Sequence, residues 1–269
     1  IAVYKNIDAL RIVLDSIATQ SMSVDEIIIA EDGHFDEMAA FLYYLKMDNL
    51  INFTKDDLGW RKALSLNNAI KKASGDYLIF IDGDVVPHSR FIEGHITSAT
   101  RGIVFCGKRS ELGEKTSKAI YDGSLHVRDL QKRYLINALA LHVDGVRHYE
   151  EGLYVKPHGI IHNWMKERVV KYIIGCNFSC FKDDFVAING FDEDYTQPTV
   201  GEDIDLGWRF IGMGIQLRSV RQVAVVYHLW HKKNFDTSTI KENDKILLKN
   251  FEVNRYVCLN GLEKLKDDR

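Results

Sequence analysis

The stretch Tyr77-Leu78-Ile79-Phe80-Ile81-Asp82-Gly83-Asp84 joins a run of apolar residues to two carboxylates. A short continuous apolar run is typical of a strand that is buried on both faces of a mostly parallel sheet. Ligands of such sheets collect beyond the carboxyl ends of the strands, which is where the two acids lie. A hairpin turn is the alternative, because Asp-Gly is a common turn dipeptide. This stretch alone therefore fits either a hairpin turn or a site for a metal ion and phosphate, and the flanking residues distinguish the two.

Short apolar strands alternate with helical patterns on both sides of this stretch. The alternation predicts parallel βαβ units, and so an α/β fold with a Rossmann-like, mostly parallel central sheet and helices on both faces. The expected strands are residues 2–4, 26–30, 77–81, 102–106 and 223–227, and the expected helices are 9–17, 63–73, 91–98 and 206–211.

Two segments depart from this alternation. The pattern is weak from Lys108 to Arg168, which we interpret as an insertion or a subdomain. The segment after Lys232 is charged and carries an apolar stripe at helical spacing, formed by Ile246, Leu247, Phe251 and Val257. The stripe predicts a helix that packs on the domain or on a second subunit, with peripheral membrane contact as the alternative.

The composition excludes several classes of protein. With 269 residues, 46% of them hydrophobic, the chain can form a sizeable core, and a net charge of -3 gives no field that would gather nucleic acid. There is no apolar run long enough to span a bilayer and no signal-peptide pattern, so we expect a cytoplasmic protein, either free or at the inner face of the membrane. Because the chain begins inside an expected strand, we also expect it to be a piece of a longer protein. The four cysteines are scattered and predict buried, reduced thiols rather than disulfides or a zinc site.

Acidic residues gather at the ends of the expected strands. Asp84 can bind Mg²⁺ or Mn²⁺, because hard cations prefer carboxylate oxygens, and Asp82 is then left for ribose or water. Gly83 allows the backbone to approach a ligand closely. Asp32 closes an earlier strand at the same edge, where it can accept hydrogen bonds from a base or ribose or act as a turn residue.

A second group of polar residues comes late in the chain. Glu202 and Asp203 precede a helical run, so either could take a proton from an attacking hydroxyl, although acids are also favoured there by the helix dipole. His228 and His231 follow the last expected strand and could complete the shell of Mn²⁺, or be structural. Trp164 and Trp208 could stack on a sugar face or pack in the core.

Several short segments along the chain follow one another in a specific order and spacing. They include Val3-Tyr4, Glu31-Asp32-Gly33, Gly59-Trp60-Arg61-Lys62-Ala63, Asn67-Asn68-Ala69, Gly75 to Asp84, Gly175-Cys176-Asn177-Phe178-Ser179, Asn189-Gly190-Phe191-Asp192-Glu193, Gly201-Glu202-Asp203 with Arg209, and Tyr227-His228. In this order they resemble family 2 glycosyltransferases with the GT-A fold, in the galactosyltransferase-like and chondroitin-synthase-like branch. The segment from Lys108 to Arg168 matches that family poorly.

The resemblance implies a UDP-sugar donor whose uracil meets Asp32, with Val3 and Tyr4 lining the pocket and Arg61 near the base or diphosphate. It implies that Asp82 contacts ribose and that Asp84, with His228 or His231, holds Mn²⁺ or Mg²⁺ on the diphosphate. It also implies that Asp203 is the general base that takes the proton of the acceptor hydroxyl. The segment around Asn177 would face the acceptor, a glycan or glycolipid.

The expected organisation follows from these roles. Residues 1–107 form a nucleotide-sugar-binding half, 108–231 an acceptor-binding and catalytic half of the same GT-A domain, and 232–269 a helical extension. The expected activity is metal-dependent, inverting transfer of a hexose or N-acetylhexosamine to an acceptor hydroxyl, in polysaccharide or glycoconjugate synthesis. A non-catalytic GT-A nucleotide or glycan-binding module and a sugar nucleotidyltransferase are the alternatives. The nucleotidyltransferase is disfavoured because Lys5-Asn6-Ile7-Asp8 is not a glycine-rich triphosphate loop.

Overall fold

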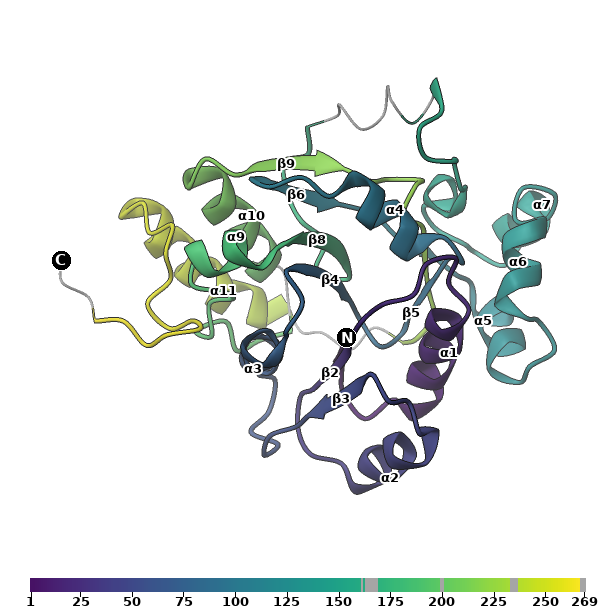
Figure 1. Cartoon of the computed structure of the whole chain (residues 1–269), viewed down its shortest axis with the longest axis horizontal. Helices are drawn as coiled ribbons and strands as arrows, with labels where there is room; N and C mark the ends of the chain where they lie inside the picture. The colour runs from purple at the N-terminus through teal and green to yellow at the C-terminus, as the bar shows by residue number, and fades with distance from the viewer. Residues whose placement is uncertain (161, 163–168, 199–200, 233–236, 267–269) are drawn as a thin grey trace.

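Three small sheets meet around the residues that follow strand β4 (Figure 1). The computed structural model describes residues 1–160, 162, 169–198, 201–232 and 237–266. The strands are β1 (Ala2–Val3), β2 (Ile27–Glu31), β3 (Leu50–Phe53), β4 (Tyr77–Ile81), β5 (Val85–Pro87), β6 (Ile103–Cys106), β7 (Ser110–Glu111), β8 (Asn177–Phe181), β9 (Gln216–Ser219) and β10 (Val226–His228). The helices are α1 (Ile7–Ala18), α2 (Asp36–Leu45), α3 (Lys62–Lys72), α4 (Phe91–Ser98), α5 (Glu114–Tyr121), α6 (Val127–Arg133), α7 (Ala138–Val143), the 3-10 helix η1 (Tyr149–Gly152), α9 (Lys182–Ala187), α10 (Glu202–Gly212) and α11 (Thr237–Glu252).

Parallel pairing joins the first sheet to the second. Strands β1, β2 and β3 are parallel, and a parallel bridge between Ala2 and Asp82 connects β1 to the end of β4. The second sheet has the order β4-β8-β6-β9, and the third has the order β5-β10-β7. The expected α/β fold with a Rossmann-like parallel element is therefore confirmed, and the carboxyl ends of β1, β2 and β4 lie at one edge.

The central sheet is mixed, because β8 runs antiparallel to both β4 and β6. The sequence of β8 did not predict a strand, since Asn177 and Ser179 interrupt its apolar residues. Both polar side chains are nevertheless fully buried and bond to one imidazole, with His95 Nδ1 2.7 Å from Ser179 Oγ and His95 Nε2 3.1 Å from Asn177 Oδ1. Because a buried polar group must be paired, His95 allows this strand to lie inside the sheet.

Alternating side chains of the central sheet form two apolar clusters. Ile79 and Ile81 of β4 pack with α1 and α4, whereas Leu78 and Phe80 pack with α3, α9 and α10. Helices therefore cover both faces, as expected for a strand that is apolar throughout. The Phe80 ring stacks on Phe178 of β8, with the ring centroids 4.4 Å apart.

Two helical groups lie at opposite sides of the molecule (Figure 1). Helices α5, α6 and α7 form the segment whose sequence pattern is weak, and α11 packs beside α10, where the Trp208 ring lies 4.5 Å from that of Phe251. The apolar stripe predicted for the C-terminal helix is thus used partly in packing on the domain, and Val257 lies beyond the end of α11. None of the helices in the described ranges is long and apolar enough to cross a membrane.

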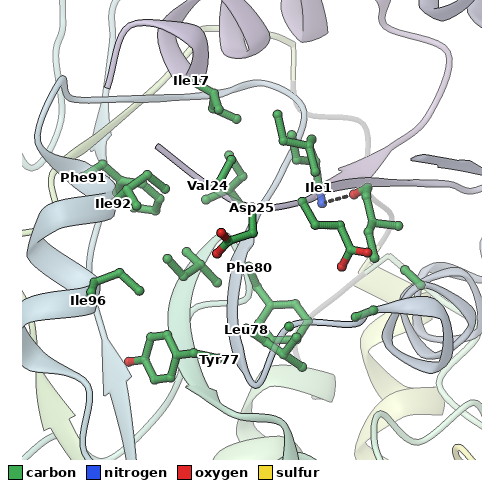
Figure 2. A pocket seen from close by; sticks show the side chains of 18 of the residues that line it. Ile1, Ile17, Val24, Asp25, Tyr77, Leu78, Phe80, Phe91, Ile92 and Ile96 are labelled. Atoms are coloured by element: carbon green, nitrogen blue, oxygen red, sulfur yellow. Dashed lines mark hydrogen bonds between the residues drawn. The ribbon is translucent and has the colours of Figure 1, made fainter. Parts of the chain in front are cut away.

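An apolar cavity of about 310 Å³ lies between β2, β4, α3 and α4, beside the short strand β1 (Figure 2). Aliphatic and aromatic side chains line most of it, and its acidic lining residues are Asp25 and Glu26. The Asp82 to Asp84 segment does not line it. This cavity therefore offers little to a nucleotide or a metal ion.

We predict that Gly83→Ala destabilises the fold, because a Cβ at Gly83 would lie 2.8 Å from Val3 Cγ2 and 3.3 Å from Ala2 O. The Gly83 N–H donates to Ala2 O at 2.8 Å, so the backbone cannot withdraw without losing that bond. The expected loss is about 1–3 kcal/mol in the free energy of unfolding, measured by denaturant titration. Gly75→Ala is the matched control, since its nearest neighbour would be Tyr77 O at 4.0 Å. Equal stability of the two variants would contradict the prediction.

Candidate functional site

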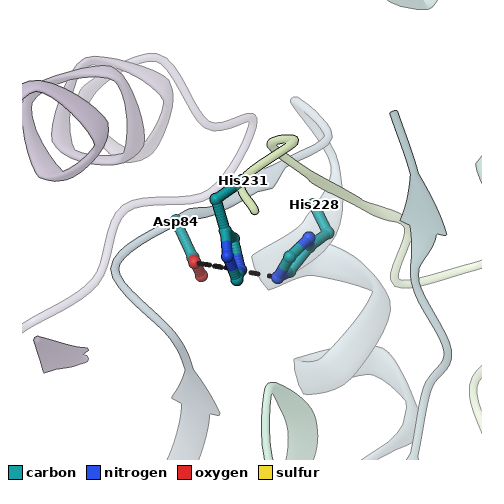
Figure 3. A group of neighbouring side chains, drawn as sticks. All are labelled: Asp84, His228 and His231. Carbon is teal, nitrogen blue, oxygen red and sulfur yellow. Dashed lines mark ion pairs between the residues drawn. The ribbon is translucent and has the colours of Figure 1, made fainter. Parts of the chain in front are cut away.

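Asp84, His228 and His231 form a three-residue group of potential metal ligands (Figure 3). Asp84 Oδ2 lies 3.7 Å from His228 Nε2 and 3.4 Å from His231 Nε2, and the ligand atoms of the group all lie within 4.8 Å of one another. Asp84 and His228 are half-buried, whereas His231 is exposed. One carboxylate oxygen and two imidazole nitrogens form a donor set that suits Mn²⁺. The structure therefore brings together both histidines named from the sequence.

Strand pairing positions this group. Asp84 directly precedes β5, whose first residue, Val85, pairs with His228 in β10, and the Leu229 N–H donates to Asp84 O at 3.0 Å. The turn to His231 is held by Trp230 N–H, which donates to Ser117 Oγ of α5 at 2.8 Å. Burial lowers the pKa of His228, although Asp84 pulls this pKa upward. A lowered pKa keeps the imidazole neutral, which is the form that binds a metal.

Asp82 has a different partner from Asp84. Lys62 Nζ, in the first turn of α3, lies 2.7 Å from Asp82 Oδ1. Burial alone would raise the pKa of Asp82, but the ammonium group of Lys62 holds it below its ordinary value. Burial would likewise lower the pKa of Lys62, yet Asp82, Glu202 and Asp203 together raise it. Lys62 is thus a charged centre shared by three carboxyl groups.

Glu202 and Asp203 begin α10 and face the same lysine. Burial raises the pKa of Glu202 to about 8, with Asp203 adding to the rise and Lys62 opposing it. Burial also raises the pKa of Asp203, against Lys62 and against the Gly175 N–H, which donates to Asp203 Oδ2 at 2.9 Å. A Cβ at Gly175 would lie 2.7 Å from Asp203 Oδ1, so a larger residue would displace this carboxylate. Two adjacent acids in such surroundings can hold different protonation states at neutral pH.

Arg109 adds a second positive charge near these groups. It is half-buried, donates to Cys176 Sγ at 3.4 Å, and is close enough to lower the pKa of Asp82 and of His228. The site therefore carries two cations, Lys62 and Arg109, beside its acidic residues. Guanidinium and ammonium groups form charge-assisted hydrogen bonds to anionic groups such as phosphate.

The residues expected around the nucleotide base, uracil, lie at or just beyond the carboxyl ends of β1 and β2. Asp32 is buried, pairs with Lys55 Nζ at 2.8 Å, and accepts from the backbone N–H of Arg61 at 2.8 Å. Val3 is also buried, whereas Tyr4 is 55% exposed and its hydroxyl donates to Asp57 Oδ2 at 3.3 Å. The structure thus brings Asp32 and the backbone of Arg61 together. The Arg61 guanidinium donates instead to Trp60 O at 2.9 Å.

The three residues predicted to contact an acceptor have other surroundings. The Asn177 side chain is fully buried and donates to Lys108 O at 2.7 Å and Ala224 O at 2.9 Å, so it ties β8 to these two neighbouring segments, and its contact with an acceptor stays a prediction. Trp208 packs between Phe251 and Tyr256, on the side of α10 that faces α11. Trp164 lies outside the described residues.

Sequence reasoning missed Lys55, Lys62 and Arg109 as site residues. Lys62 is the first residue of α3 and directly follows the predicted Arg61, so its place at the strand edge could have been inferred from the helix boundary. Arg109 lies between β6 and β7, in a segment whose pattern predicted no element. Only the tertiary packing brings its guanidinium to Asp82.

Family models cover most of the chain. The model for glycosyl transferase family 2 matches residues 1–145, and the model described as the N-terminal domain of galactosyltransferase matches residues 156–232. The two matched segments contain all the residues of the site: Asp82 and Asp84 lie in the first, and Asp203 and both histidines lie in the second.

Curated relatives share a shorter segment. Poly-beta-1,6-N-acetyl-D-glucosamine synthase of Staphylococcus aureus (strain MSSA476) is 33% identical over 86 residues, which is 32% of this chain and 21% of the relative. The synthase of the same name from Staphylococcus epidermidis is 31% identical over 86 residues, with the same coverage of both chains. The matched segment therefore spans about a fifth of the length of these relatives.

A solved structure confirms the fold over nearly the whole chain. The crystal structure of GalNAc-T7 with UDP, GalNAc and Mn²⁺ superposes with a TM-score of 0.63 at 11% identity, over 92% of this chain and 47% of that one. This likeness shows the GT-A arrangement of sheets and helices. Because the family model matches more than half of its residues, this protein belongs to glycosyl transferase family 2.

Proposed function

We propose that this protein transfers a hexose or N-acetylhexosamine from a UDP-sugar to a hydroxyl group of a glycan or glycolipid acceptor, with inversion at the anomeric carbon. The observation that carries the proposal is the arrangement of two chemically distinct groups around Asp82 and Lys62. One is the potential metal group of Asp84, His228 and His231, and the other is the carboxyl pair of Glu202 and Asp203.

A nucleotide diphosphate fits the cationic side of the site. Lys62 and Arg109 can contact phosphate oxygens, while Asp32 and Asp82 at the strand ends can accept hydrogen bonds from the base and ribose. Mn²⁺ or Mg²⁺ held by Asp84 and the two histidines would supply Lewis-acid stabilisation of the departing diphosphate. The likeness to a structure that holds UDP and Mn²⁺ supports this assignment.

The carboxyl pair divides the proton chemistry. Asp203, fixed by the Gly175 N–H, is the general base that takes the proton of the attacking hydroxyl. A raised pKa makes its carboxylate a stronger base than an exposed aspartate. Glu202, with its pKa near 8, stays protonated at neutral pH and can donate a hydrogen bond to a sugar hydroxyl. Both acids lie in the first turn of α10, so a rigid element positions them together.

The relatives suggest a polymer-forming role. The Staphylococcus enzymes are named as synthases of a β-1,6-linked N-acetylglucosamine polymer, so N-acetylhexosamine donors are the first to test. The match of 86 residues is shorter than the stretch from Asp32 to His231, so it covers only part of the site.

The first prediction concerns the reaction itself. With Mn²⁺, an acceptor glycan and a panel of UDP-sugars, the protein should release free UDP and form a glycosylated product, detected by chromatography and mass spectrometry. Asp203→Asn should lower the rate by a factor of about 10² to 10⁴, because an amide cannot take the proton. It should still bind UDP. Release of pyrophosphate would indicate nucleotidyl transfer instead, and UDP binding with no product from any donor would indicate a binding module.

The second prediction concerns the metal. Asp84→Ala and His228→Ala should each weaken Mn²⁺ binding in the presence of UDP, measured by calorimetry, by about tenfold or more, because each removes a proposed ligand. His34→Ala is the matched control, since His34 is exposed and pairs only with Asp36 in the described contacts. If the three variants bind Mn²⁺ equally well, the metal assignment is wrong.

The third prediction concerns pH. If protonated Glu202 assists the reaction, kcat should fall as the pH rises through about 8, because the neutral form of this carboxyl exists below its pKa and is lost above it. Glu202→Gln keeps a hydrogen-bond donor that does not titrate, so its profile should lack this alkaline limb. Rates at saturating Mn²⁺ from pH 6 to about 9.5 would measure the difference. An unchanged alkaline limb in Glu202→Gln would refute the role of Glu202.

A further inference from the structure

Helices α6 and α7 lie on the side of the molecule opposite α11 (Figure 1). Helix α7 and the turn that joins it to α6 expose large aliphatic side chains. We call Leu135, Ile136, Leu139 and Val143 the aliphatic patch; their exposed fractions are 70%, 81%, 78% and 74%. Single exposed apolar residues are ordinary on protein surfaces, but a contiguous group of this kind marks an interaction site.

Local geometry places the aliphatic patch on one face. Hydrogen bonds from Asn137 N to Arg133 O and from Leu141 N to Asn137 O continue the helical turns from α6 into α7. Side chains three and four residues apart in such turns are neighbours, so the patch forms one surface. The opposite face is buried through Leu130, Tyr134 and Leu141. The exposed residues are therefore not needed for the core of the described structure.

Basic residues border the aliphatic patch. Arg128 is exposed in the first turn of α6, Lys132 and Arg133 are exposed in its last turn, and His142 is exposed in α7. Asp129 is the only acid between residues 126 and 143, and it lies 4.0 Å from Lys132 Nζ. The chain as a whole carries a net charge of -3, so the basic border of the patch is opposite in sign to the overall charge.

We propose that the aliphatic patch and its basic border form a site that binds an anionic membrane surface. Apolar side chains next to Lys and Arg are the combination by which a helix lies in the interface of a bilayer with acidic headgroups. An anionic bilayer is the partner that complements both features.

This site differs from the membrane contact considered for the C-terminal helix. The described part of α11 exposes one large aliphatic side chain, Leu248, at 59%, while Ile246, Leu247 and Phe251 are half-buried. Its charges are mixed, because residues 241–252 contain three Lys and three acidic residues. The aliphatic patch on α6 and α7 is the more apolar and the more cationic of the two surfaces.

Contacts link the α5–α7 group to the candidate site. Tyr134, on the inner side of α6 and α7, bonds to Ser110 Oγ of β7 at 2.7 Å, and β7 pairs with β10, the strand that carries His228. Ser117 of α5 accepts the hydrogen bond from Trp230, between the two histidines. Binding of the aliphatic patch to a membrane would therefore hold the site at a defined orientation to that surface.

Vesicle sedimentation tests this proposal without any requirement for catalysis. The protein should sediment with vesicles of phosphatidylcholine mixed with phosphatidylglycerol, and much less with phosphatidylcholine alone or at high salt. Ile136→Asp/Leu139→Asp should lower the partition coefficient by about tenfold or more, because two inserted side chains are lost. Lys132→Gln/Arg133→Gln should lower it by a similar factor on the anionic vesicles only.

Leu248→Asp is the matched control, since it makes the same kind of change on α11 and should leave vesicle binding intact. The circular dichroism spectra and melting temperatures of all variants should match those of the parent, because the altered side chains are exposed. Three results would overturn the proposal: no sedimentation of the parent with anionic vesicles, equal binding of the Ile136→Asp/Leu139→Asp variant, or a concentration-dependent dimer in light scattering that this variant abolishes.

Discussion

The ion pair between Lys62 and Asp82 is the interaction on which the arrangement of the site depends. It joins the start of α3 to the end of β4, and its lysine also faces Glu202 and Asp203 of α10. Without this cation, three carboxyl groups would share a half-buried space, and their mutual repulsion would further raise the pKa of at least one of them. Lys62 permits Asp82 to stay ionised while burial keeps the pKa of the two later acids raised.

A second constraint is the close approach of β1 to the segment after β4. Gly83 leaves no space for a side chain beside Val3, so the backbone of β1 bonds directly to the chain between the two aspartates. This contact turns Asp82 and Asp84 toward different partners, Lys62 for the first and the two histidines for the second. Gly83 therefore has a structural role in strand packing, in addition to the ligand contact predicted for it.

Much of the framework and of the metal group could be predicted from residue patterns. The run from Tyr77 to Ile81 is a strand with helices on both of its faces, and Phe91 to Ser98 is a helix with the predicted bounds. Asp84, His228 and His231 do converge. The antiparallel strand β8 was missed because its polar residues looked exposed in sequence, whereas His95 satisfies them in the interior.

The sequence by itself determined where elements such as β4 and α4 lie, because apolar periodicity and short polar interruptions are local signals. It also determined membership of the family, since the order of its motifs does not depend on coordinates. Only the tertiary structure decided which side chains lie together: Lys62 and Arg109 with Asp82, and Trp208 with Phe251 of α11. Electrostatic and packing partners that are distant in sequence come together through the fold, and no spacing rule along the chain encodes them.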